Sequence, residues 1–140
     1  MAGSGATLTW SELDAQSNQL ARLWRAQGLR VGDHVACIMD NSLEVSVVYW
    51  AAERSGLYYT PINSHLNATE IAYILNNCTA QSLIVSERLR GVAAEALATA
   101  TLVNSALIVG EGDATFTNFH EALAEYATSP IDDETAGGAM

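Results

Sequence analysis

The amino-acid sequence predicts an α/β domain, with a mainly parallel sheet of about four strands and helices on both of its faces. Two observations lead to this prediction. Short apolar runs alternate along the chain with longer segments that carry helix-capping residues and an apolar stripe. In addition, strand, helix and strand follow one another in residues 34–62, within the length of one right-handed βαβ crossover.

This central unit begins with a strand. Residues 34–39 are rich in apolar side chains and predict a fully buried strand. Residues 40–42, Asp-Asn-Ser, end the strand and offer side-chain oxygens that cap a following helix. Nearly every position in 43–52 is apolar, which predicts a helix buried on more than one side. Gly56 ends that helix, and residues 57–62 are the next predicted strand.

Another helix precedes the central unit. Thr9 and Glu12 match a capping box, in which each side chain accepts a hydrogen bond from the other residue's backbone N–H, and Gly28 marks the predicted helix end. The predicted apolar stripe consists of Leu13, Ser17, Leu20, Ala21 and Trp24, and the predicted outer face of Asp14, Asn18, Arg22 and Arg25.

The second half of the chain repeats the alternation. The predicted helix starts are Asn67 with Glu70, Ser86, and Asn118 with Glu121, and the predicted strands are residues 82–85 and 106–109. We therefore expect one α/β unit over residues 9–127, preceded by a flexible lead-in at residues 1–8. Residues 128–140 carry three consecutive acids and a Gly-Gly pair without periodicity, and predict a linker or a disordered tail.

Composition and charge exclude several classes of partner. The chain of 140 residues has 16 acidic and 6 basic residues, a net charge of −10, and no lysine. Such a field repels nucleic acids and anionic membranes. No apolar run is long enough for a transmembrane segment and no signal peptide is evident, so we expect a cytoplasmic protein. Cys37 and Cys78 lack the spacing of a metal site and are predicted to be reduced, structural thiols.

The residues by themselves predict no catalytic centre and no metal site. A glycine-rich phosphate turn is missing after the first strand, where Asp40 would repel a phosphate. Residues 110–112, Gly-Glu-Gly, lack a third glycine and are interpreted as a turn. The chain also has no nucleophile elbow. The aromatic residues Trp10, Trp24, Tyr49, Trp50, Tyr58 and Tyr59 are interpreted as core packing, because the basic residues that accompany base stacking are missing.

The three histidines are candidates of unequal interest. His34, His65 and His120 are spaced too irregularly for a metal site, and a structural or solvated role is expected for each. His65 differs from the other two because it follows the carboxyl end of a predicted parallel strand, where open α/β sheets place their ligands.

The order of motifs resembles the N-terminal region of AMP-forming acyl-CoA synthetases, the adenylate-forming family that includes fatty-acid–CoA ligases. The resemblance rests on TLTWSELDAQSNQLARLWRAQGLRVGDHVACIMDNSLE and on SGLYYTPINSHLNATEIAYILNNCTAQSLIVSE, and it extends from about residue 7 to the C-terminus. It implies that the fold is part of the large N-terminal domain of an adenylate-forming enzyme. The end of the chain resembles the segment that leads into the phosphate-binding loop of the family.

The resemblance implies an activity for a parent enzyme. Members of the family activate a carboxylate with ATP and Mg²⁺ to an acyl-adenylate and then transfer the acyl group to coenzyme A. Their phosphate loop and catalytic lysine lie farther along the chain, so we expect an N-terminal structural fragment that is inactive by itself. Its expected partners are the remainder of the ligase and, for the parent, a small carboxylate, with fatty acids the expected class. The fragment is expected to self-associate through exposed apolar surface.

His65 is the only site residue that the resemblance implies. The family often has an arginine at this position, near the phosphates of coenzyme A, and histidine replaces it with a pH-dependent charge. A solvated loop histidine is the alternative. For the whole chain, the alternative is a free-standing flavodoxin-like binding or regulatory module without catalysis.

Overall fold

The computed structural model describes residues 9–40 and 43–131. In these residues, five strands pair in parallel in a single sheet, in the order β2-β1-β3-β4-β5. The strands are β1 (His34–Ile38), β2 (Tyr58–Pro61), β3 (Ala80–Ser86), β4 (Ser105–Val109) and β5 (Thr117–Asn118). The predicted parallel sheet is therefore confirmed, with one strand more than expected.

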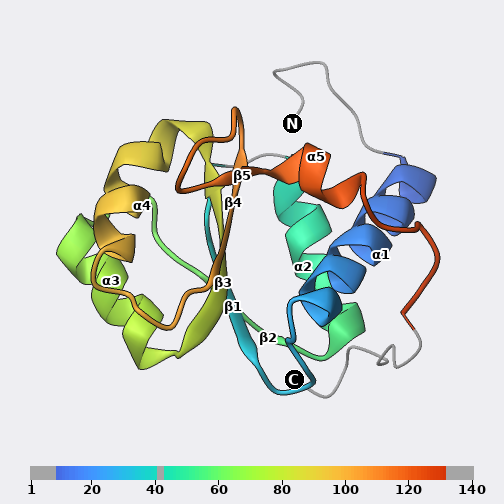
Figure 1. Ribbon diagram of the computed structural model, residues 1–140, viewed down its shortest axis with the longest axis horizontal. Coiled ribbons are helices and arrows are strands. Elements are labelled where there is room, and N and C mark those ends of the chain that lie inside the picture. The colour runs from blue at the N-terminus through green and yellow to red at the C-terminus, as the bar shows by residue number, and fades with distance from the viewer. Residues whose placement is uncertain (1–8, 41–42, 132–140) are drawn as a thin grey trace.

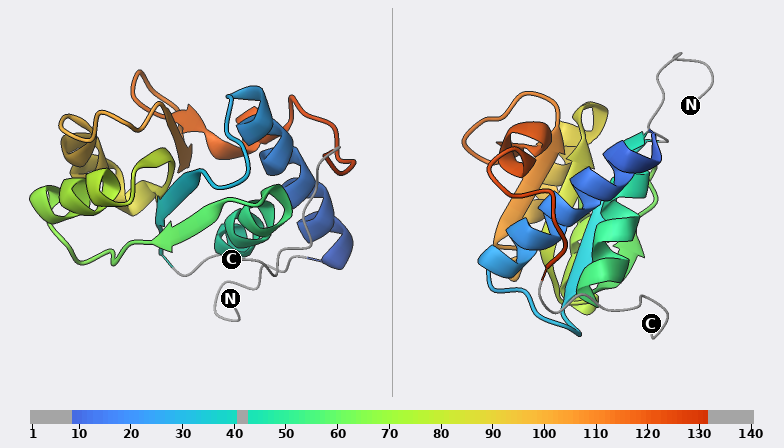
Figure 2. Two further views of the ribbon diagram at one scale, coloured as in Figure 1. Left: turned by 90° about the horizontal axis from the view of Figure 1, so that it is seen from below. Right: turned by 90° about the vertical axis from the view of Figure 1, so that its right-hand side faces the viewer.

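Helices cover both faces of the sheet, as predicted. The helices are α1 (Trp10–Ala26), α2 (Leu43–Ser55), α3 (Ala68–Asn77), α4 (Arg90–Leu97) and α5 (Phe119–Leu123), with a 3₁₀ turn, η2 (Glu87–Leu89), before α4. Helices α1, α2 and α5 lie on one face, and α3 and α4 lie on the other (Figure 1). Figure 2 shows the same three layers from two further directions.

The side chains of β1 show how one strand serves two cores. Val35 and Cys37 pack into the core under α1 and α2, whereas Ala36 and Ile38 pack into the core under α3 and α4. Successive side chains of a strand point to opposite faces, so an uninterrupted apolar run is what a sheet with two covered faces requires.

Three of the predicted helix starts are confirmed. Thr9 caps α1 and Asn67 caps α3, each in a reciprocal capping box, and Asn118 caps α5 by accepting a hydrogen bond from the backbone N–H of Glu121. The predicted cap residues Asn41 and Ser42 lie outside the described residues.

The predicted cap at Ser86 is wrong. Its side chain makes no capping hydrogen bond, and η2 separates Ser86 from α4. The hydroxyl Oγ instead accepts a hydrogen bond of 2.8 Å from the backbone N–H of Asp40, at the end of β1. Ser86 thus joins the ends of two neighbouring strands, because a tertiary partner competes for the same oxygen.

The fifth strand, β5, was not predicted. It contains only Thr117 and Asn118, neither of which is apolar, and it pairs with Leu107 and Ile108 of β4. A pair of polar residues carries no periodic signal, so only the sheet reveals this strand.

Part of the expected tail lies against α1. The side-chain amide of Asn18 donates to the carbonyl of Thr128 at 2.8 Å, and Arg22 donates to the carbonyls of Ser129 and Pro130 at 2.7 and 2.8 Å. Residues 128–130 of the predicted linker or tail are therefore hydrogen-bonded to α1, while residues 132–140 lie outside the described part of the chain. The prediction that Asn18 faces outward is wrong, since only 1% of its surface is exposed.

The prediction that α2 is buried on more than one side is also wrong. Val47, Val48, Ala51 and Ala52 are buried, but Tyr49 and Trp50 are 43% and 38% exposed. The core interpretation of the aromatic set holds for Trp24, which is fully buried. Trp10, Tyr49, Trp50 and Tyr58 are exposed, and Tyr59 is half-buried.

Candidate functional site

The loops that follow β1, β2, β3 and β4 all leave the sheet at its carboxyl edge, because every strand runs in the same direction. Asp40 follows β1, His65 follows β2, Arg88 and Arg90 follow β3, and Gly110 follows β4. This carboxyl edge is where an open parallel sheet usually binds ligands, so its charges decide what the site can hold.

Asp40 and Arg88 form an ion pair at the centre of this edge. The Nε and Nη2 atoms of Arg88 lie 3.1 and 2.6 Å from the carboxylate oxygens of Asp40. The hydrogen bonds from Arg88, followed by its positive charge and a smaller contribution from His65, hold the pKa of Asp40 below its ordinary value. The carboxylate is therefore ionised at neutral pH and occupies the guanidinium that an anionic ligand would need.

His65 lies on the exposed loop that follows β2. Its backbone N–H donates to the side-chain oxygen of Asn63 at 2.8 Å, which closes a turn and orients the loop. The charge of His65 makes a small contribution to the lowered pKa of Asp40. The structure thus places His65 in the loop after β2, at the predicted carboxyl edge of the sheet.

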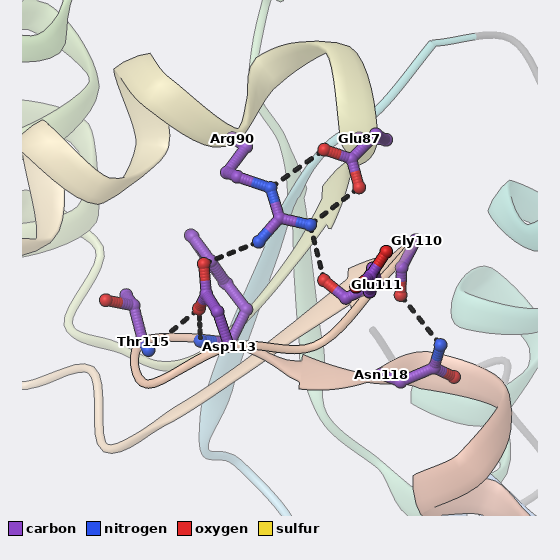
Figure 3. A network of polar contacts seen from close by, with 8 residues as sticks. Glu87, Arg90, Gly110, Glu111, Asp113, Thr115 and Asn118 are labelled. Atoms are coloured by element: carbon purple, nitrogen blue, oxygen red, sulfur yellow. Dashed lines mark hydrogen bonds and ion pairs between the residues drawn. The ribbon is translucent and has the colours of Figure 1, made fainter.

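A second charge cluster, centred on Arg90, ties two loops of the same edge together (Figure 3). Arg90 donates to both carboxylate oxygens of Glu87, at 2.8 and 2.6 Å, and to a carboxylate oxygen of Asp113 at 2.6 Å. It also donates to the carbonyl of Glu111. The contact with Glu87 raises the pKa of Arg90 and lowers the pKa of Glu87. The pKa of Asp113 is lowered mainly by hydrogen bonds from the backbone N–H groups of Phe116 and Thr115, and less by Arg90.

The loop at residues 110–116 owes its shape to this cluster. Asp113 accepts hydrogen bonds of 2.8 Å from the backbone N–H groups of Thr115 and Phe116, and Asn118 donates to the carbonyl of Gly110 at 2.7 Å. A Cβ atom at Gly110 would collide with Oε1 of Glu87, so a larger residue there would displace the carboxylate that Arg90 binds. The interpretation of Gly-Glu-Gly as a turn is therefore consistent with its packing.

The sequence did not reveal this cluster. Arg90 and Asp113 are 23 positions apart, and no local pattern connects them. A cavity of about 320 Å³ is lined by three acidic residues, Glu87, Glu111 and Asp113, and by a single guanidinium, that of Arg90. The cavity is thus a poor place for a phosphate.

The other histidines and the cysteines occupy structural positions. His34 stacks on Tyr58 with ring centroids 4.7 Å apart, and His120 lies 2.9 Å from a carboxylate oxygen of Glu44. Cys37 and Cys78 are both free thiols, as predicted. Within residues 9–40 and 43–131, no group of three or more His, Cys, Asp or Glu side chains is arranged to hold a metal ion.

Trp10, Trp50, Tyr49 and Tyr59 contact one another in a row, which we call the aromatic face. Trp10 packs edge-on against Trp50, Trp50 against Tyr49, and Tyr49 against Tyr59 of the edge strand β2, with centroid separations of 6.3, 5.7 and 5.7 Å.

In the described part of the chain, no helix has both the length and the apolar character of a membrane span.

Comparisons with known proteins agree with the fold. A family model described as AMP-binding enzyme matches residues 1–136. Crotonobetaine/carnitine–CoA ligase of Proteus mirabilis is 33% identical over 85 residues, which are 61% of this chain and 16% of that protein. Surfactin synthase subunit 2 of Bacillus subtilis is 40% identical over 84 residues, which are 60% of this chain and 2% of that protein.

A solved structure shares the same architecture. The Mycobacterium tuberculosis fatty acyl CoA synthetase aligns with a TM-score of 0.79 and 25% identity, over 95% of this chain and 26% of that one. The chain therefore spans only a small part of the length of the enzymes that it resembles.

Proposed function

Because this chain belongs to the family of AMP-binding enzymes, we propose that it forms the N-terminal part of a cytoplasmic ligase that activates a fatty acid with ATP and then transfers the acyl group to coenzyme A. The similarity to a CoA ligase and to a fatty acyl CoA synthetase supports this assignment. In this proposal the 140 residues are a structural part of the ligase, and the groups that act on the carboxylate belong to the remainder of the enzyme.

The observation that carries the proposal is the state of the arginines at the carboxyl edge. Arg88 is paired with Asp40, and Arg90 with Glu87 and Asp113. A triphosphate would have to displace these carboxylates, and no glycine-rich turn follows β1 to replace them with backbone N–H groups. The described residues therefore do not fit ATP, and we propose that ATP and its Mg²⁺ are bound by later parts of the ligase.

Coenzyme A is a better match for this edge. Its phosphates attract positive charge, and the exposed His65 can supply it because Arg88 and Arg90 are already paired with carboxylates. We propose that His65 contacts a coenzyme A phosphate during thioester formation. The role is one of binding, because adenylate formation precedes the arrival of coenzyme A.

Calorimetric titration tests the assignment. The 140-residue chain, and the same chain extended through its downstream sequence, are titrated with ATP and Mg²⁺, with coenzyme A, and with a non-hydrolysable acyl-adenylate mimic. We expect the longer chain to bind all three and the short chain to bind no nucleotide. Tight ATP binding by the 140 residues alone would overturn the proposal and favour the free-standing flavodoxin-like module.

Substitutions of His65 in the longer enzyme test the coenzyme A contact. We expect His65→Ala to raise the KM for coenzyme A while ATP–pyrophosphate exchange, which reports adenylate formation, stays unchanged. His65→Arg keeps a positive charge at this position, so this KM should be no higher than in the unsubstituted enzyme. His34→Ala is the matched control, because His34 is the first residue of β1 and lies at the amino edge of the sheet, away from His65 at the carboxyl edge. An unchanged KM in His65→Ala would show that His65 is a solvated loop residue.

The aromatic face supports the expected self-association. Trp10 is 75% exposed, and together with Tyr49 and Trp50 it presents apolar surface beside the edge strand β2. We propose that the isolated 140-residue chain associates through this face and that the remainder of the ligase covers it in the whole enzyme. Sedimentation analysis should show dimers that the double substitution Trp10→Ser, Trp50→Ser dissociates. A monomer at every concentration would contradict this proposal.

A further inference from the structure

A cleft of about 560 Å³ lies between the second half of α1 and residues 125–131. Its lining includes Arg22, Arg25 and Arg30, which are three of the six basic residues in a chain with a net charge of −10. The cleft lies where α1 leads into β1, at the amino edge of the sheet, and is therefore remote from His65 and Arg88. A concentration of positive charge in so acidic a chain calls for a physical explanation.

The hydrogen bonds of Arg22 and Arg30 leave their charge uncompensated within residues 9–40 and 43–131. Arg22 donates to the carbonyls of Ser129 and Pro130 and to the hydroxyl of Ser129, and all three acceptors are neutral. Arg30 donates through Nη1 alone, to the carbonyls of Arg25 and Leu29 at 3.2 and 3.0 Å. Both guanidinium groups at the carboxyl edge, by contrast, are paired with carboxylates.

The free edge of Arg30 has the geometry that an anion needs. With Nη1 engaged, the Nε and Nη2 atoms have no acceptor in the described part of the chain. These two N–H groups point in parallel and match two oxygens of one phosphate or carboxylate group. The carbonyl contacts through Nη1 hold the guanidinium in place, so less side-chain entropy is lost when an anion binds.

Two features oppose anion binding, and both are weaker than the attraction. Glu125 contributes a carboxylate to the lining, and α1 ends here, with a negative dipole end worth roughly half a charge. The guanidinium groups of Arg22 and Arg30, whose hydrogen bonds all go to neutral oxygens, outweigh this negative charge. The volume also lies in the range of about 300–1,000 Å³ that is typical of small-molecule sites.

We propose that this cleft, which is lined by Arg22, Arg25 and Arg30 and which we call the arginine cleft, is a binding site for a small phosphate-bearing anion. It is separate from the coenzyme A contact proposed for His65 and does not depend on the proposed ligase function. The shared chemistry is a phosphate group held by the Nε–Nη2 edge of Arg30 and attracted by the positive charge of Arg22. A free inorganic phosphate or pyrophosphate and the phosphate of a nucleotide both carry such a group, so the experiment uses each of them.

The test is an NMR titration of the 140-residue chain with inorganic phosphate, pyrophosphate and AMP, each at low and at high salt. We expect pyrophosphate to shift the amide signals of residues 22–30 and 125–131, with an affinity that falls as salt rises. AMP binding as tightly as pyrophosphate would identify a nucleotide as the ligand. A preference for pyrophosphate would identify the free anion.

Two variants with the same change in charge make the test specific. Arg30→Gln removes the guanidinium edge and should weaken pyrophosphate binding at least about tenfold. Arg88→Gln is the matched control, because it removes an exposed arginine at the opposite edge and should leave the affinity within about twofold. Arg22 is not substituted, since its hydrogen bonds hold residues 128–131 in place.

Either of two results would overturn the proposal. Equal weakening by Arg30→Gln and Arg88→Gln would show a general response to charge. A chain that ends at Ile131 lacks the acids Asp132, Asp133 and Glu134, and binding that appears only in this shorter chain would show that the cleft serves the protein's own acidic segment. Binding of equal strength in both chain lengths, lost with Arg30→Gln alone, would support an anion from solution.

Discussion

Ser82 and Ser105 provide a matched pair for measuring a buried hydrogen bond in the sheet. They are direct neighbours in the register of β3 and β4, and both are buried. Ser82 Oγ accepts a hydrogen bond of 3.0 Å from Nε1 of Trp24, whereas Ser105 Oγ has no partner among the described residues. The same substitution, serine to alanine, should therefore have opposite consequences at the two positions.

The magnitude follows from the partner left behind. Ser82→Ala leaves the indole N–H of the fully buried Trp24 without an acceptor, which costs about 1–3 kcal/mol. Ser105→Ala removes a hydroxyl that already lacks a partner, so we expect no loss of stability, and a gain of up to about 1 kcal/mol. For a chain of this length, 1 kcal/mol corresponds to roughly 3 °C in Tm.

Urea unfolding followed by tryptophan fluorescence measures both variants, and Trp24→Phe completes a double-mutant cycle with Ser82→Ala. In the Trp24→Phe background the loss caused by Ser82→Ala should shrink by about 1 kcal/mol, because no N–H remains to be left unpaired. Circular dichroism follows unfolding in that background. Equal losses from Ser82→Ala and Ser105→Ala, or a cycle without coupling, would refute the role given to the Trp24–Ser82 hydrogen bond.

Three further predictions concern the polar contacts. Asp40 has a lowered pKa in the folded chain, so its contribution to stability is present above the ordinary carboxyl pKa and is lost as the pH falls through the folded value. Arg88→Gln should raise the pKa of Asp40 in an NMR titration, and an unchanged pKa would contradict the ion pair. Arg90→Gln should accelerate amide hydrogen exchange at Thr115, whose N–H is held by a carboxylate that Arg90 orients, and exchange as slow as in the unsubstituted chain would exclude this role. Asn18→Ala should lower the free energy of unfolding by about 1–3 kcal/mol in the urea assay, because Arg54 loses an acceptor and the carbonyl of Thr128 loses a donor. A change below about 0.5 kcal/mol would contradict that estimate.

The elements that the sequence predicted best are those with local signals. Thr9 and Glu12, or Asn67 and Glu70, lie three positions apart, and each capping box forms without help from the rest of the fold. The strands of the sheet were predictable for a related reason, because a run such as that of β1 must be apolar at every position when both faces are covered.

Errors arose where the environment of a residue depends on distant parts of the chain. Periodicity placed Asn18 on the outer face of α1, but Arg54 donates to its side-chain oxygen at 2.9 Å, and residues 128–131 cover it. The same limit applies to Trp50, since an apolar residue on a helix is exposed when no neighbouring element lies over it. The pattern of residue types shows which residues share a face of a helix, but the neighbouring elements decide which faces are buried.

The position of the candidate site could be predicted from the sequence, but the pairing of its charged side chains could not. His65 was expected at the carboxyl edge because a parallel strand ends there, and that depends only on the order of strands. The pairing of Arg88 with Asp40 links residues 48 positions apart, so the sequence shows the two charges without showing that they cancel.

This cancellation connects the proposed function with the arginine cleft. At the carboxyl edge the guanidinium groups of Arg88 and Arg90 are paired with carboxylates, so a ligand there must bring its own cation or rely on His65. At the amino edge the hydrogen bonds of Arg22 and Arg30 go to neutral oxygens, and both arginines line the cleft. The two edges of one sheet should therefore respond to salt differently: pyrophosphate binding in the cleft should weaken as salt rises, whereas the pKa of Asp40 should change little, because a direct ion pair is far shorter than the screening length of about 10 Å at 0.1 M salt.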